Sequence, residues 1–327
     1  MEKLLHRFIL KNDVFEVFRP FFWVVKIHGL AAFHLDNEAF RTSWWGNFFF
    51  FSSLAFAFFV TKEWWSDFFL ITFSKTLSTG FNLVLIMVQV ILILFIILNF
   101  CQKQNQHKIY KSLHKIDKKV KRLNFDHNSN KLIFYFQMEK FVKINYTKQF
   151  LVILASSLMF VFYAVLKFCM QVTESFLSSI LTYFVNGVYA LILFQSFIPL
   201  YLIYARLQCF NEFLNLLAFD KISKQEFRNF HALIFKIFDV IDVVNQTFGF
   251  QLLIITLEML TSGSFTNFAI FEAVIFEDQQ YANFAAYMIF DNSLDYFGFT
   301  FIFIIASLIT NEVRSVSRFY FGDCEDY

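Results

Sequence analysis

The 327-residue sequence has little proline, glycine or charge: it contains 2 Pro and 8 Gly, and 17% of its residues are charged. Sheet-and-turn architectures place Gly and Pro at their turns, and an outer-membrane barrel needs alternating ten-residue segments, which are absent here. Hydrophobic residues make up 57% of the chain and aromatic residues 22%, with 53 Phe. A soluble domain of this length could not bury so much apolar surface. The composition therefore predicts an all-α, polytopic membrane helical bundle.

Cysteine is also sparse. The four cysteines, at positions 101, 169, 209 and 324, are widely separated, and no Cys or His spacing typical of a zinc site occurs. We expect no metal site, no cofactor and no structural disulfide.

Six apolar segments are long enough to cross a hydrocarbon core of about 30 Å, which takes about 20 helical residues. We expect these spans at 43–61, 80–100, 149–170, 176–206, 244–275 and 286–310. Residues 1–42 are expected to form a cytoplasmic or interfacial segment, in which Arg19-Pro20 ends a short helix and residues 21–33 lie at the lipid headgroups. The bundle would thus occupy 43–310, followed by a cytoplasmic tail at 311–327.

The distribution of basic residues predicts the orientation. The segment 102–148 carries 12 Lys or Arg, whereas the short connections 171–175 and 276–285 carry only acidic charges. By the positive-inside rule, 102–148 is cytoplasmic, together with 207–243, and an even number of spans then places both termini in the cytoplasm. We therefore expect a multi-pass membrane protein with its N-terminus in the cytoplasm. Its basic surface favours anionic membrane lipid over nucleic acid as a partner.

Both cytoplasmic loops show the apolar periodicity of helices. In the first, apolar residues recur at spacings of 4, 3, 4 and 3, at Ile109, Leu113, Ile116, Val120 and Leu123. In the second, the apolar face continues into the fifth span and comprises Phe230, Leu233, Ile234, Ile237, Ile241 and Val244. These faces need a partner, which is either an intramolecular bundle or another copy of the chain.

Polar side chains inside apolar segments are candidate functional groups, because lipid offers them no hydrogen bonds. Glu258 lies midway along the fifth span. It is either a functional carboxylate or a neutral acid bonded to Gln195 or Asn186 on the fourth span. Aromatic and polar residues in the outer half of the bundle could line a pocket for a small apolar ligand, or could simply pack: Phe160, Tyr163, Tyr183, Asn186 and Tyr189.

Asp291 and Asp295 lie four residues apart on one helix face near the outer end of the sixth span. They could bind Mg²⁺ and a diphosphate, as in a membrane transferase, but a second acidic pair and nearby basic residues are lacking. The alternatives are the polar rim of a ligand cavity and a solvated helix start.

Four stretches carry a family resemblance: RPFFWVVKIHGLAAF (19–33), LQCFNEFLNLL (207–217), IDVVNQTFGFQLL (241–253) and FIFIIASLITNEVRSVSR (301–318). On these stretches the sequence resembles the insect gustatory receptor family of chemoreceptors. The resemblance implies that Asn245, Phe248, Gly249 and Gln251 belong to a structural motif at the cytoplasmic end of the fifth span.

The resemblance further implies a non-enzymatic, ligand-gated, cation-conducting tetramer, built with itself or with related receptor subunits. Its ligand is a small-molecule tastant or odorant, bound in the outer half of the first six helices. The family's seventh helix lines the pore and carries Thr-Tyr, five apolar residues and Gln-Phe. At Thr182-Tyr183 the position of the Gln is Tyr189, so the motif does not match. We therefore expect six spans without that helix in these residues, because the sequence is either truncated or a genuine six-span form. Such a subunit would conduct only with full-length partners. The alternative is a transporter or lipid-binding membrane protein that uses Glu258.

Overall fold

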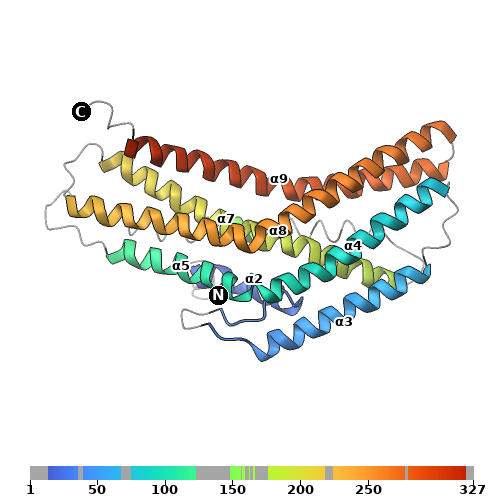
Figure 1. Ribbon diagram of the computed structural model, residues 1–327, viewed down its shortest axis with the longest axis horizontal. Coiled ribbons are helices and arrows are strands. Elements are labelled where there is room, and N and C mark those ends of the chain that lie inside the picture. The colour runs from blue at the N-terminus through green and yellow to red at the C-terminus, as the bar shows by residue number, and fades with distance from the viewer. Residues whose placement is uncertain are drawn as a thin grey trace, which may run out of the picture.

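The computed structural model describes residues 14–35, 40–67, 75–122, 148–155, 176–217, 224–276 and 279–321, together with 157, 158, 162 and 165. Within these residues the regular structure is helical, apart from one isolated antiparallel bridge between Phe33 and Thr42 (Figure 1). The predicted all-α class is confirmed.

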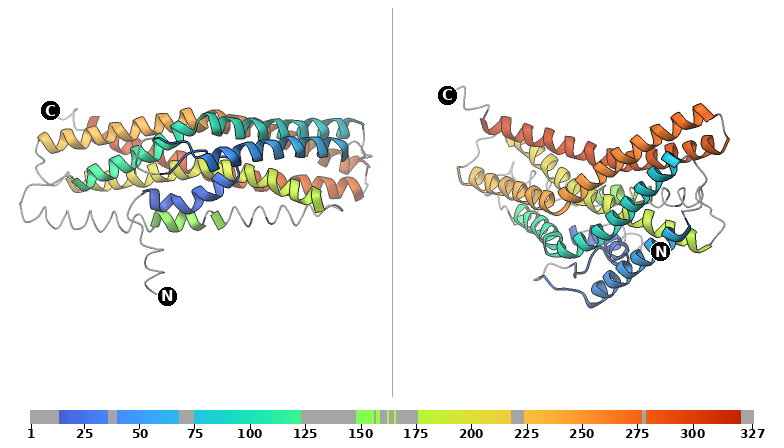
Figure 2. Two further views of the ribbon diagram at one scale, coloured as in Figure 1. Left: turned by 90° about the horizontal axis from the view of Figure 1, so that it is seen from below. Right: turned by 45° about the vertical axis from the view of Figure 1, so that its right-hand side comes forward.

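The helices lie roughly along the long axis of the molecule, and the views in Figures 1 and 2 agree on this. The C-terminal ends of α5, α7 and α9 gather at one end with the start of α8. The end of α3, the starts of α4, α7 and α9, and the end of α8 gather at the other. The two predicted cytoplasmic loops and the tail thus approach one end, whereas α2, from the predicted N-terminal segment, lies nearer the middle of the molecule. The bounds are α2 Val14–Ile27, α3 Trp44–Asp67, α4 Lys75–Cys101, α5 Lys103–Arg122, α7 Phe176–Leu217, α8 Lys224–Phe276 and α9 Gln279–Phe321.

Among the described residues, fewer helices qualify as membrane spans than the six that the sequence predicted. In the described parts of the chain, three stretches are long and apolar enough to cross a membrane: Gly187–Glu212, His231–Ile275 and Phe299–Ser317. A fourth arises if the pair Ile86–Cys101 and Lys103–Val120, bent by 57°, is one span. Trp44–Phe59 is apolar but shorter, and half of the predicted span at 149–170 lies outside the described residues. The chain is a multi-pass helical membrane protein, and the count of six spans stays a prediction.

The predicted helix end at Arg19-Pro20 is wrong, because α2 continues through Pro20 to Ile27. Proline removes one backbone hydrogen bond from a helix interior. Apolar side chains on both sides of Pro20 are buried in the same core, and this burial offsets the loss. They are Val14, Phe15, Val17, Phe18, Phe21, Phe22 and Val25.

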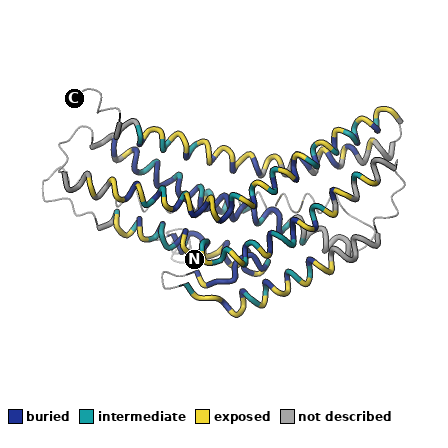
Figure 3. The backbone as a smooth tube through the Cα atoms, viewed as in Figure 1, coloured by how far each residue is buried: buried dark blue, intermediate teal, exposed yellow. Residues whose placement is uncertain are grey.

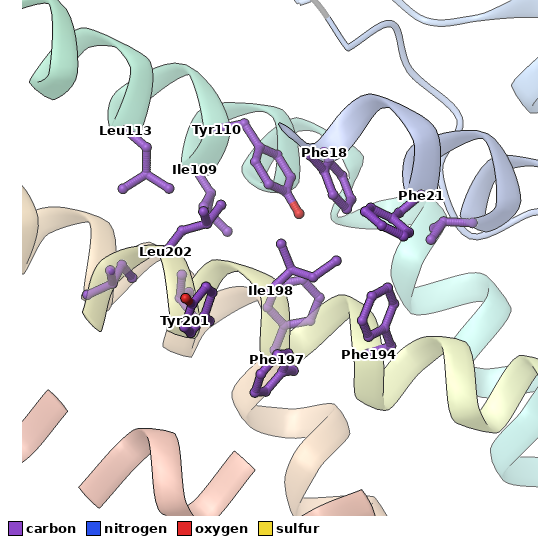
Figure 4. Packing of buried hydrophobic residues seen from close by; sticks show 14 of the residues in the cluster. Phe18, Phe21, Ile109, Tyr110, Leu113, Phe194, Phe197, Ile198, Tyr201 and Leu202 are labelled. Atoms are coloured by element: carbon purple, nitrogen blue, oxygen red, sulfur yellow. The ribbon is translucent and has the colours of Figure 1, made fainter. Parts of the chain in front are cut away.

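Aromatic contacts hold α2 against α5 and α7 (Figure 4). The Phe18 ring stacks on Tyr110 of α5, with centroids 4.5 Å apart. The Phe21 ring meets Phe194 of α7 edge-on at 5.7 Å. Offset and edge-on pairs each add about 0.5–1.5 kcal/mol beyond the area they bury. The segment is therefore part of the packed core, while Trp23 and Ile27 on its other face are exposed.

The apolar faces predicted in the two cytoplasmic loops are covered within this chain. Helix α5 buries Ile109, Leu113 and Ile116 completely or nearly so, and it packs against α8. On α8, three residues of the face predicted for the second loop are buried: Leu233, Ile234 and Ile237. Of the two alternatives, the structure shows the intramolecular bundle for these faces. Figure 3 shows buried residues concentrated in the middle of the molecule, while much of α3 and α9 is exposed.

One buried ion pair joins α5 to α7. Arg206 is 6% exposed, and its Nε and Nη2 donate to the two carboxylate oxygens of Asp117 at 2.9 and 2.6 Å. Its Nη1 donates to the backbone carbonyl of Leu202 at 2.6 Å. The guanidinium thus has two charge-assisted bonds to one carboxylate, which is the geometry that binds most strongly.

Candidate functional site

A buried tyrosine–carboxylate pair lies between α7 and α8. The Tyr189 hydroxyl donates to Oε2 of Glu258 at 2.6 Å, and the two residues are 9% and 7% exposed. The Tyr189 ring also lies beside the Phe95 ring of α4, with centroids 6.2 Å apart. The structure therefore brings together two of the residues that the sequence singled out. The pair combines a polar anchor with aromatic walls, as pockets for small ligands do.

Of the two partners predicted for Glu258, Gln195 needs correction. Gln195 does not bond this acid: its Nε2 donates to Oε1 of Gln106 on α5 at 3.0 Å. Six residues separate Gln195 from Tyr189 on the same helix, and at 100° per residue they point in different directions. The Asn186 side chain lies outside the described residues. Tyr189 was predicted as a pocket residue but not as the partner of Glu258.

Beyond this pair, a second polar contact links α8 to α9. Asn292 is 6% exposed; its Oδ1 accepts from the Ser262 hydroxyl at 2.7 Å. Its Nδ2 donates to the Ser262 carbonyl at 3.3 Å and to the Thr266 hydroxyl. Sequence analysis missed Asn292, although the rule that selected Asn186, an amide inside an apolar segment, applies to it equally.

Glu258, Ser262 and Thr266 follow each other at four-residue spacing and share one face of α8. Each is at most 7% exposed. This face therefore presents polar groups to the interior of the bundle. Tyr189 of α7 and Asn292 of α9 form hydrogen bonds with them.

The other predicted pocket residues cannot be placed in the same way. Phe160 and Tyr163 lie outside the described residues. Tyr183 and Asn186 are on α7, and Asp291 and Asp295 are on α9, but their side chains are not among those described. A pocket formed by these six residues stays a prediction.

The predicted structural motif on α8 divides into buried and exposed members. Phe248 and Gln251 are 2% and 0% exposed, whereas Asn245 is exposed. A Cβ at Gly249 would meet no other atom within 4 Å, so close packing does not explain this glycine. The motif therefore supplies core contacts through two of its four residues.

Comparison with known families accounts for nearly the whole chain. The sequence model described as 7tm Chemosensory receptor matches residues 18–320. No curated protein matches the chain. The matched range covers all the described helices apart from the first four residues of α2 and the last residue of α9. This chain belongs to the 7tm chemosensory receptor family.

Proposed function

We propose that this chain is a chemoreceptor that binds a small-molecule tastant or odorant in the plasma membrane of a sensory cell. Membership of the chemosensory receptor family supports the receptor role. We propose no catalytic role, and none for Asp291 and Asp295 in diphosphate chemistry. The basic character of 102–148 supports a cytoplasmic N-terminus and contact with anionic lipid.

The observation that carries the proposed site is the buried bond between Tyr189 and Glu258. A ligand hydroxyl, amine or amide N–H can take the place of the Tyr189 hydroxyl on the carboxylate, while the apolar part of the ligand lies against Phe95. The carboxylate then exchanges one buried hydrogen bond for another, while the displaced Tyr189 hydroxyl gives up its bond to Glu258. This arrangement favours a mostly apolar ligand with one hydrogen-bond donor.

We propose further that ligand binding opens a cation pore in a tetramer with itself or with related subunits. The ligand can shift the closed–open equilibrium only by its difference in affinity for the two states. The pair is suited to this role because it joins α7 to α8, so a ligand inserted there changes how these two helices are held together.

The test is a dose–response measurement in cells that express the chain with related receptor subunits. Glu258→Gln should raise the half-maximal concentration of an active ligand by about 10-fold, since loss of a good buried hydrogen bond costs about 1–3 kcal/mol. Tyr189→Phe should lower that concentration, because the ligand then displaces no hydroxyl from the carboxylate. Tyr201→Phe is the matched control: it removes a buried hydroxyl from the same helix, away from the pair. Unchanged responses in both pair variants would refute the proposed site.

Transport remains the second candidate, because an intramembrane carboxylate such as Glu258 is also typical of proton-coupled carriers. Uptake of a substrate that disappears in Glu258→Gln, without any ligand-evoked current in the unmodified protein, would favour the transporter over the receptor.

A further inference from the structure

The carboxamide of Gln251 is buried without partners. Gln251 is 0% exposed, and neither its Oε1 nor its Nε2 has a hydrogen-bond partner in the described part of the protein. Each such buried group left unsatisfied costs about 1–3 kcal/mol. A native helix bundle therefore needs something at this position that both donates and accepts hydrogen bonds.

A second unsatisfied amide atom lies at the same depth of the bundle. Helices α7 and α8 run in opposite directions and are tied together at Tyr189 and Glu258. Seven residues before Glu258, on the same face of α8, comes Gln251, about 10 Å along the axis. Six residues after Tyr189 comes Gln195, about 9 Å along α7 in the same direction and turned by about 120° around the helix. This turn brings its amide to Gln106 of α5, and α5 itself packs against α8. Gln195 is 3% exposed and its Oε1 also lacks a partner among the described residues.

Gln195 ends a chain of buried amides. Its Nε2 donates to Oε1 of Gln106 at 3.0 Å, and Nε2 of Gln106 donates to Oδ1 of Asn99 at 2.7 Å. Asn99 in turn donates to the Phe95 carbonyl at 3.0 Å. This chain connects α4 and α5, on the two sides of their bend, to α7, and it leaves one acceptor oxygen at its end.

We propose that an internal water molecule binds between α7 and α8 at Gln251 and Gln195. The water donates its two hydrogens to Oε1 of Gln251 and Oε1 of Gln195, and it accepts from Nε2 of Gln251. These three bonds are the usual number for a buried water. They satisfy every atom named above, and they extend the amide chain onto α8.

Two other occupants fit less well. A direct bond from Nε2 of Gln251 to Oε1 of Gln195 would leave Oε1 of Gln251 unsatisfied. A cation would have only neutral oxygens for ligands and would face the N–H groups of Gln251, which repel positive charge. Water both donates and accepts, and it needs no compensating charge. The inference does not depend on the receptor role.

X-ray radiolytic labelling of the purified full chain tests the site, because hydroxyl radicals form at bound waters and oxidise the nearest side chains. Phe248 lies three residues from Gln251 on α8 and is 2% exposed. It should be oxidised despite its burial, while Phe33, at 1% exposed, stays protected. Gln251→Leu should abolish the labelling of Phe248. Gln246→Leu, the same change at an exposed position of α8, should leave it intact.

Protection of Phe248 equal to that of Phe33 in the unmodified protein would overturn the proposal, and this result needs no variant to fold. Labelling that persists in a folded Gln251→Leu variant would overturn it as well. Thermal unfolding gives an independent readout: Gln251→Leu should lower the Tm, because the water and the Gln195 oxygen lose their partner. A raised Tm would show that the unmodified site is dry.

Discussion

The ion pair between Arg206 and Asp117 gives the most quantitative prediction. Its charged groups are 7% and 13% exposed, so solvent screens them weakly. Removal of one partner takes both charge-assisted bonds of the pair from the remaining buried charge, which typically costs about 3–5 kcal/mol. We expect Asp117→Leu and Arg206→Met each to lower the unfolding free energy by about this amount.

The double variant Asp117→Leu/Arg206→Met should behave differently. Both charges are then gone, no ion is left buried, and two apolar side chains fill a similar volume, so the cost should fall to about 1 kcal/mol or less. The double variant is therefore expected to be more stable than either single variant. Lys in place of Arg206 should retain only part of the stability, because an ammonium cannot reproduce the two parallel bonds of the guanidinium.

The assay is thermal and denaturant unfolding of the detergent-solubilised protein, followed by size-exclusion chromatography and intrinsic Trp fluorescence. Arg228→Met serves as a control, because Arg228 is an exposed cation on α8. If the costs of the two single changes add in the double variant, the ion pair does not exist in the native state. Single variants as stable as the control would refute the reasoning in the same way.

Helix packing between α8 and α9 yields two further predictions, both measured by the same unfolding assay. Gly249→Ala should be neutral or stabilise by up to about 1 kcal/mol, because its Cβ meets open space. Gly263→Ala should be the less stable of the two variants, because its Cβ would lie 2.5 Å from the Tyr296 hydroxyl and the Tyr296 side chain must shift. Equal effects at the two glycines would contradict this close approach. Asn292→Ala should cost about 1–2 kcal/mol, since interhelical hydrogen bonds in membranes average about 0.6 kcal/mol each, and the exposed Ser293→Ala should cost little. If Asn292→Ala left the unfolding free energy unchanged, the hydrogen bonds of Asn292 would not stabilise this interface.

The sequence predicted the helices well wherever periodicity was strong. The spacing of Ile109, Leu113 and Ile116 predicted both the existence of α5 and its buried face. The apolar face from Leu233 onward predicted that α8 runs unbroken from the loop into the span. In both cases apolar residues recur about every 3.6 positions. This repeat is enough to predict the helix and its buried face, because it does not depend on which helix packs against that face.

The errors came from contacts between distant residues. Local sequence favours a helix stop at Pro20, and only packing of the flanking Phe residues against α5 and α7 explains why the helix continues. Similarly, the sequence identified Glu258 and Tyr189 separately, but the pairing depends on the rotation of α7 about its axis. A one-dimensional pattern does not determine that rotation, so the sequence suggested Gln195 or Asn186 instead.

Helix α8 contains 53 residues in one unbroken run, from Lys224 to Phe276. At 1.5 Å per residue this is about 80 Å, more than twice the thickness of a hydrocarbon core of about 30 Å. One element therefore carries both Glu258 and, some 30 Å away along the same backbone, the residues that pack against α5. A change in how the carboxylate is held therefore acts on the same helix that packs against α5, with no loop between the two sites.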